Sequence, residues 1–166
     1  DALTHAIESY ISRKAQPLTE ILSLEAIRMM GTYLRRACAN PEDLEAKNYV
    51  MLASTVAGMA FSNSSVAMVH GMSRPIGACF HVPHGLSNAI LLPLVMDFSR
   101  VAAPEKFADI ADAMGETIDG LTDMEAAQVA VEAVHQLCDD IKIPRAAELK
   151  LKKEEFMKMA PKMAED

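Results

Sequence analysis

Two short blocks of this 166-residue chain carry side chains that can bind a metal ion. Asp1 and His5 are four residues apart, so on a helix their side chains would share one face, one turn apart. His70 and His84 lie at the two ends of the second block. One carboxylate and three imidazoles form a mixed oxygen and nitrogen set, which suits Fe(II), Zn(II), Co(II) or Ni(II) better than Ca(II) or Mg(II). If these four side chains meet, they predict a site for a first-row transition metal.

Each of these residues also has an ordinary structural interpretation. An Asp and a His at this spacing are common as a surface pair on a helix. His70 follows an apolar stretch and could be a buried, hydrogen-bonded histidine, whereas His84 could begin a helix between Pro83 and Gly85. Three of the five histidines nevertheless fall between positions 70 and 84, which makes three separate structural roles less natural. The residues alone leave both interpretations open.

Proline and glycine divide the chain into segments whose apolar residues recur at helical spacing. The third segment is almost wholly apolar after Val50, which predicts the central helix of a bundle. Gly71, Pro75 and Gly77 are expected to interrupt the chain between the last two candidate ligands, and Pro93 is expected to kink the helix that follows. The predicted helices cover residues 1–13, 19–39, 41–64 with Pro41 in the first turn, 85–98, 104–114, 122–138 and 152–164.

The composition predicts one domain over residues 1–166 that is mostly α-helical, and the apolar third segment indicates a multi-helix bundle. Hydrophobic residues make up 51% of the chain, aromatic residues only 5%, and twelve methionines accompany many alanines and leucines. Strand-like alternation is missing, and so is a glycine-rich loop that could receive a pyrophosphate at a helix N-terminus. A nicotinamide cofactor would therefore have to be bound mainly by residues outside this chain.

The charge and the cysteines exclude several classes of function. The net charge of −7 is dispersed, which argues against a nucleic-acid partner. No apolar run is long enough to cross a membrane, so no membrane partner is expected. Cys38, Cys79 and Cys138 form no CxxC pair and are interpreted as reduced thiols, so we expect a cytoplasmic location.

Four segments carry a family resemblance: Asp1–Glu8, Gly58–Asn63, Val69–Met72 and Pro83–Pro93. They resemble the metal-binding half of the iron-dependent (group III) alcohol dehydrogenases, which have a dehydroquinate synthase-like fold. The match is dense over about the first hundred residues and weaker beyond them, where Ile143-Pro144-Arg145 adds to it. In that family an N-terminal α/β dinucleotide-binding domain precedes an all-helical C-terminal domain, with the metal in the cleft between them. The resemblance implies that this chain is the C-terminal domain and that the N-terminal domain is absent from it.

The resemblance also implies a site and an activity. Asp1, His5, His70 and His84 would bind Fe(II), or Zn(II), because the same ligand set suits both ions. The full-length enzyme, expected to be a homodimer, would interconvert small alcohols and aldehydes or ketones by hydride transfer with NAD or NADP. The isolated chain is expected to be inactive because it lacks the dinucleotide-binding domain.

Three further residues are weighed as site residues. Arg74 stands where many family members carry a second histidine near the nicotinamide ring, and an arginine cannot be a neutral base at pH 7. His81 is either a proton shuttle or an exposed loop residue, and Phe61 either lines the cofactor and substrate pocket or belongs to the core. Two alternatives remain open, a non-catalytic helical packing or oligomerisation domain and a glycerol dehydrogenase-like relative. The four-ligand set favours the alcohol dehydrogenase branch.

Overall fold

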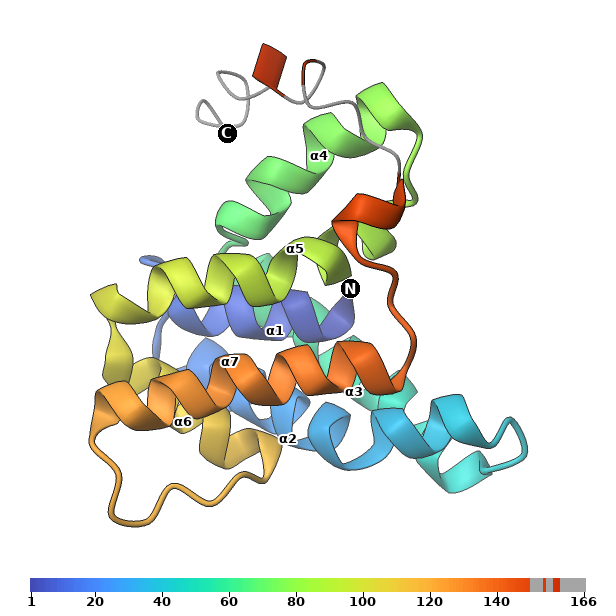
Figure 1. Cartoon of the computed structure of the whole chain (residues 1–166). Coiled ribbons are helices and arrows are strands. Elements are labelled where there is room, and N and C mark those ends of the chain that lie inside the picture. The colour runs from blue at the N-terminus through green and yellow to red at the C-terminus, as the bar shows by residue number, and fades with distance from the viewer. Residues whose placement is uncertain (150–153, 155–156, 159–166) are drawn as a thin grey trace.

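The computed structural model describes residues 1–149, 154, 157 and 158, and these residues form helices and connections without a strand (Figure 1). This confirms the predicted all-α fold class. The predicted helix over residues 152–164 lies largely outside the described residues. The helices are α1 (Ala2–Ile11), α2 (Pro17–Ala39), α3 (Leu44–Asn63), α4 (Met68–Phe80), α5 (His84–Ser99), α6 (Pro104–Met114) and α7 (Asp123–Asp140), with 3₁₀ turns η1 (Arg100–Ala102) and η2 (Ala146–Leu149).

The central helix of the bundle is α1. Every residue from Leu3 to Tyr10 is buried except His5, which is half-buried. This helix packs mainly on α2 and α3 and also contacts α4, α5 and α6. The polar residues Glu8 and Ser9 are fully buried together with the apolar ones. The helix α1 therefore contributes both apolar core side chains and buried polar groups. The helix that carries His5 and directly follows Asp1 is therefore firmly anchored in the core.

The prediction that the third helix is central is wrong. The buried residues of α3 are four alanines, whereas Met51, Leu52 and Met59 are exposed, Met51 to 70%. Small side chains let α3 approach α2 closely, and the large apolar side chains are left on the outer face. The apolar composition of a helix thus does not reveal which of its faces is buried. Pro41 also lies outside this helix, which begins at Leu44 after the N-cap Asp43.

The predicted interruption between the last two candidate ligands is wrong as well. The helix α4 continues through Gly71, Pro75 and Gly77 and ends at Phe80; the next residue, His81, caps it with a left-handed φ of 54°. A proline inside a helix removes one main-chain hydrogen bond. This loss is tolerated here because Val69, His70 and Ile76 anchor α4 by burial. The helix α5 runs through Pro93, in agreement with the predicted helix over residues 85–98.

The remaining helices pack on α1 or on one another. The pairs α2–α3 and α6–α7 make the most extensive contacts, and α5 packs on α7. Figure 1 shows α4 standing away from the other helices, above α5. Among the described residues no single helix is both long and apolar enough to cross a membrane; α3 and α4 satisfy that test only when joined across a bend of 103°.

Candidate metal centre

The four predicted ligands lie around one point, although they come from three helices. Asp1 precedes α1 and His5 is in its first turns, His70 is in α4, and His84 begins α5. The Oδ1 atom of Asp1 lies 3.8 Å from Nδ1 of His5, 3.7 Å from Nε2 of His70 and 3.9 Å from Nε2 of His84. Ligand atoms of Asp1, His5 and His70 all lie within 4.8 Å of one another. The structure thus brings all four candidate side chains together.

A buried carboxylate fixes the orientation of His70. Glu8 accepts a hydrogen bond from the main-chain N–H of Val69 at 2.6 Å through Oε1, and its Oε2 lies 2.5 Å from Nδ1 of His70. The side chains of Glu8 and His70 are 1% and 4% exposed. Because a carboxylate can only accept here, the ring proton of His70 belongs on Nδ1. The lone pair of Nε2 then points toward Asp1, which is the arrangement that a metal-binding histidine needs.

His5 is kept neutral by its surroundings. Its ring stacks on that of Phe61, with centroids 4.2 Å apart and planes at 17°, and lies 4.5 Å from the ring of His70. Burial lowers the pKa of His5 to about 4, and the neighbouring His70 adds to the effect. At neutral pH this imidazole is therefore uncharged and has a lone pair for an ion.

His84 and Asn88 enter the site from the first turns of α5. Burial, with smaller contributions from His70 and Arg74, lowers the pKa of His84 below its ordinary value. Asn88, one turn later, is fully buried, and its Nδ2 lies 2.7 Å from Oδ1 of Asp1. Gly85 lets the start of α5 lie close to Asp1, because a Cβ at this position would lie only 3.2 Å from Cβ of Asp1.

The two candidate proton-transfer residues lie outside this group of side chains. Arg74 is exposed on α4, one turn after His70, and its charge is felt at His84. His81 is exposed at the end of α4. Since each helical residue adds about 1.5 Å, the end of α4 lies about 15 Å along the axis from His70. Neither residue makes a hydrogen bond with the four predicted ligands among the described residues.

The residues at this point fit a divalent transition-metal ion. Ligand atoms at 2.0–2.2 Å from one tetrahedral ion would be about 3.3–3.6 Å apart. The separations of 3.7–3.9 Å from Asp1 need only a small contraction to reach that spacing. The buried Oδ1 of Asn88 has no hydrogen-bond partner among the described residues, an unusual feature for a polar atom in a protein interior. One carboxylate and three imidazoles also supply the charge and donor type that such an ion prefers.

Sequence reasoning missed two residues of this site, Glu8 and Asn88. Both had a positional signal, because Glu8 is three residues after His5 and Asn88 is four residues after His84, so each can share a helix face with a ligand. Burial, which gives these polar groups their significance, cannot be read from spacing.

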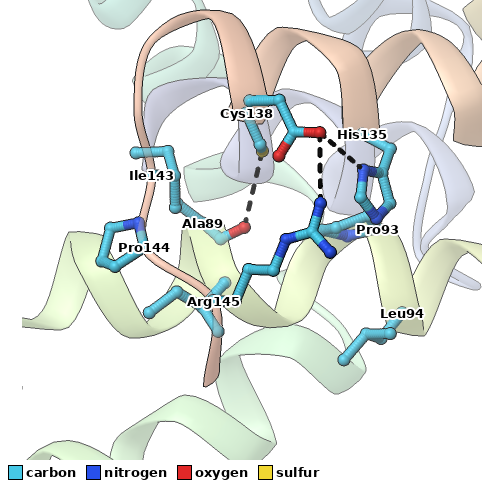
Figure 2. A pocket seen from close by; sticks show the side chains of 10 residues that line it. Ala89, Pro93, Leu94, His135, Cys138, Ile143, Pro144 and Arg145 are labelled. Carbon is cyan, nitrogen blue, oxygen red and sulfur yellow. Dashed lines mark hydrogen bonds and ion pairs between the residues drawn. The ribbon is translucent and has the colours of Figure 1, made fainter. Parts of the chain in front are cut away.

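A separate hollow of about 240 Å³ lies between α5 and α7 (Figure 2). Asp139 lies between His135 and Arg145 there, 3.7 Å and 3.5 Å from their nitrogens, and the thiol of Cys138 donates to the carbonyl of Ala89 at 3.8 Å. The polar groups of this hollow are thus engaged with one another. Among the described residues, the convergent metal-ligating atoms lie at the predicted metal site instead.

Comparison with known proteins agrees with this geometry. The model of the Fe-containing alcohol dehydrogenase family, C-terminal, matches residues 1–166. The chain is 44% identical to 1,3-propanediol dehydrogenase of Citrobacter freundii and 42% identical to lactaldehyde reductase of Escherichia coli K12. Each alignment covers 100% of this chain and 43% of the relative. The chain is also 36% identical to NAD-dependent methanol dehydrogenase of Bacillus methanolicus, of which it spans 44%.

Solved structures show the same similarity. A 1,3-propanediol oxidoreductase superposes with a TM-score of 0.98 at 44% identity, over 100% of this chain and 44% of that protein. An alcohol dehydrogenase from Oenococcus oeni superposes with a TM-score of 0.97 at 36% identity, again over 44% of its length. The chain spans less than half of each of these relatives. By sequence and by fold, it belongs to the iron-containing alcohol dehydrogenase family and corresponds to the C-terminal domain of that family.

Proposed function

We propose that this chain supplies the metal-binding, catalytic part of an NAD- or NADP-dependent alcohol dehydrogenase. The observation that carries the proposal is the convergence of Asp1, His5, His70 and His84, with the Nε2 lone pair of His70 directed into the site by Glu8. The names of the relatives, which include 1,3-propanediol dehydrogenase and lactaldehyde reductase, support a small alcohol or aldehyde as the substrate. The name of the NAD-dependent methanol dehydrogenase supports a nicotinamide cofactor.

The cofactors follow from the family and from the ligand set. Iron is favoured by the family description, and Zn(II) suits the same ligands. The ion, when bound, would polarise the hydroxyl or carbonyl oxygen of the substrate during hydride transfer. We infer that the dinucleotide is bound mainly by residues in the part of the relatives that this chain does not span. A homodimer in the cytoplasm is the expected form of the complete protein.

The residues of this chain have distinct tasks in that scheme. Glu8 holds the proton of His70 on Nδ1, so that Nε2 faces the site. Phe61 stacks on one face of the His5 ring and so restricts the orientation of that ring. Arg74, exposed beside His84, is placed to contact a negatively charged group of the cofactor or the substrate.

We infer that the proton of the alcohol passes to solvent and not to His81. His81 is exposed and follows a helix whose length separates it from His70. His81→Ala in the complete enzyme should therefore change kcat by less than about 10-fold and leave the metal content unchanged. A kcat loss of about 100-fold or more at neutral pH, together with a vanished inflection in the pH–rate profile near the ordinary histidine range, would assign the proton to His81.

The proposed function is tested by metal content and turnover together. The complete protein should contain about one divalent ion per chain and should reduce NAD or NADP in the presence of 1,2- or 1,3-propanediol. His70→Ala should lower both the ion content and the turnover more than about 100-fold. The matched control is His135→Ala, because His135 is an exposed histidine on α7. It should keep the ion and the activity.

Two outcomes would contradict the proposal. Complete protein without a stoichiometric ion, even after incubation with Fe(II) or Zn(II), would favour the non-catalytic packing or oligomerisation domain. Turnover by the 166-residue chain alone would show that the nicotinamide cofactor is bound by residues of this chain.

A further inference from the structure

The side chain of Asn88 lies at the centre of the predicted metal site. It is fully buried, and its Nδ2 lies 2.7 Å from Oδ1 of Asp1, 3.0 Å from Nε2 of His70 and 3.1 Å from Nε2 of His84. All the hydrogen bonds of this amide within the described residues are thus made to predicted ligands. An asparagine that only filled space in a helix would be expected to bond to the main chain nearby.

The side-chain N–H₂ group of Asn88 and a metal ion compete for the same lone pairs on the imidazole nitrogens. A neutral imidazole nitrogen that accepts a hydrogen bond has one lone pair, so Nε2 of His70 or His84 can accept from Asn88 or bind an ion, but not both. A carboxylate oxygen has more than one acceptor site, so Oδ1 of Asp1 can keep its bond to Asn88 while it binds an ion. Binding of an ion would therefore end the contacts of Asn88 with His70 and His84 but not its contact with Asp1.

We propose that Asn88 is a positioning residue that assembles the metal site before the ion arrives. In the ion-free protein one N–H of Asn88 donates to Asp1, and the other is shared between His70 and His84, so that three ligands from three segments are already at binding distance. Nε2 of His70 and of His84 would give up this N–H in order to hold an ion, and Asn88 would remain the hydrogen-bond donor that orients the Asp1 carboxylate. This inference rests on the proposed function, since it assumes that these four side chains bind an ion.

The affinity for Zn(II) tests the proposal. Asn88→Ala should weaken the binding of Zn(II) to the complete protein by about 10- to 100-fold in competition titrations with a chelator. The matched control is Asn63→Ala, since the Asn63 side chain is exposed and donates to the carbonyl of Met59 on its own helix. This control should bind Zn(II) like the unchanged protein. Circular dichroism of each variant shows whether its helices are retained.

Histidine tautomers give a second readout that a merely structural role would not change. The tautomer of a histidine follows from the hydrogen bonds of its ring, so ¹⁵N NMR of the ion-free, unchanged chain at pH 8 should show His70 and His84 protonated on Nδ1. In Asn88→Ala, His84 should lose this preference, whereas His70 should keep it because Glu8 still accepts from Nδ1. The two histidines thus serve as test and internal control.

The outcomes separate this inference from the proposed function. If the complete protein without a substitution binds no Zn(II), the proposed function fails, and the tautomers still decide whether Asn88 organises the site. If the complete protein binds Zn(II) and Asn88→Ala binds it equally well, the positioning role is refuted. Protonation of His84 on Nε2 in the unchanged ion-free chain would also overturn it, because Asn88 could not then donate to that nitrogen.

Discussion

Glu8 needs a carboxylate, and not only a side chain of this shape, because both of its oxygens accept hydrogen bonds. Its two oxygens each accept from a different donor, the N–H of Val69 and the Nδ1–H of His70. In Glu8→Gln the amide must present an N–H₂ group to one of them. The N–H of Val69 cannot change, whereas His70 can move its proton to Nε2. That tautomer would block the lone pair that faces Asp1, so Glu8→Gln should weaken Zn(II) binding by about 10- to 100-fold.

The same substitution should destabilise the chain by only about 1–3 kcal/mol, because one buried hydrogen bond is lost or reversed. Urea unfolding and chelator competition, measured on the same variant, separate the two effects. Glu25→Gln is a suitable control, since Glu25 forms an exposed pair with Arg28, and it should alter neither quantity beyond about 0.5 kcal/mol. Unchanged Zn(II) affinity in a folded Glu8→Gln variant would show that Glu8 only supports the packing.

His5 should make the ion-free chain sensitive to acid. Burial lowers its pKa to about 4 in the folded chain, whereas an unfolded histidine titrates near its ordinary value of 6.5. Between these values the unfolded state binds more protons, so the free energy of unfolding should fall as the pH falls from about 6.5 to about 4. We expect a loss of about 1–3 kcal/mol in urea titrations with a chelator present. His5→Gln should show a smaller loss over this range; an equal loss would assign the acid sensitivity to other groups.

The four predicted ligands could be named from the sequence because residue type, spacing and family resemblance coincide at Asp1, His5, His70 and His84. Glu8 could not be assigned, because a glutamate beside a histidine is ordinarily a solvated charge and only the fold buries it. Asn88 was within a matching segment, but an amide has no chemistry of its own that would single it out. The side chains that hold a site together are thus less visible in a sequence than those that bind the ion.

Two glycines on neighbouring helices should respond to alanine in opposite ways. A Cβ on Gly31 of α2 would lie 2.9 Å from the carbonyl oxygen of Met114 on α6, and main chain cannot move aside as a flexible side chain can. Gly31→Ala should therefore destabilise the chain by about 1–3 kcal/mol. A Cβ on Gly58 of α3 meets nothing within 4 Å, so Gly58→Ala should stabilise the chain by about 0.5–1 kcal/mol.

Thermal or urea unfolding of the two variants measures this difference. Both substitutions exchange the same residues inside a helix, so helix propensity is common to them and the difference reports the contact with Met114. Equal stability of the two variants would show that α2 and α6 can separate at this point without cost.

At the level of helices, the sequence predicted most elements, but the predictions for the continuity of α4 and for the burial of α3 were wrong. Pro17 and Pro104 lie in the first turns of α2 and α6, so both prolines correctly indicated where helices begin. Pro75 was misleading because a proline ends a helix only when tertiary contacts do not hold the next turn, and Ile76 is buried. The role of α3 was misleading because four alanines, not its larger apolar residues, face the core.

The molecule as a whole uses α1 for two purposes. The helix that fills the centre of the bundle also carries His5 and Glu8 and directly follows Asp1, so the site and the core share one scaffold. The hydroxyl of Tyr10 donates to Asp109 of α6 at 2.5 Å, and the ammonium group of Lys106 donates to the carbonyl of Tyr10 at 2.8 Å. These contacts fix the position of α1 along its axis, which in turn sets the position of the ligands.

The peripheral position of α4 has a consequence for how fast an ion could be exchanged. This helix packs mainly on α5, with a smaller contact to α1, yet it supplies His70. A local opening that swings α4 away would release that ligand while the rest of the bundle stays folded. The dissociation rate of a bound ion should then follow the opening rate of one helix and be independent of global stability. Hydrogen exchange with and without Zn(II) checks this, because added ion should slow exchange in α4 far more than in α6 or α7.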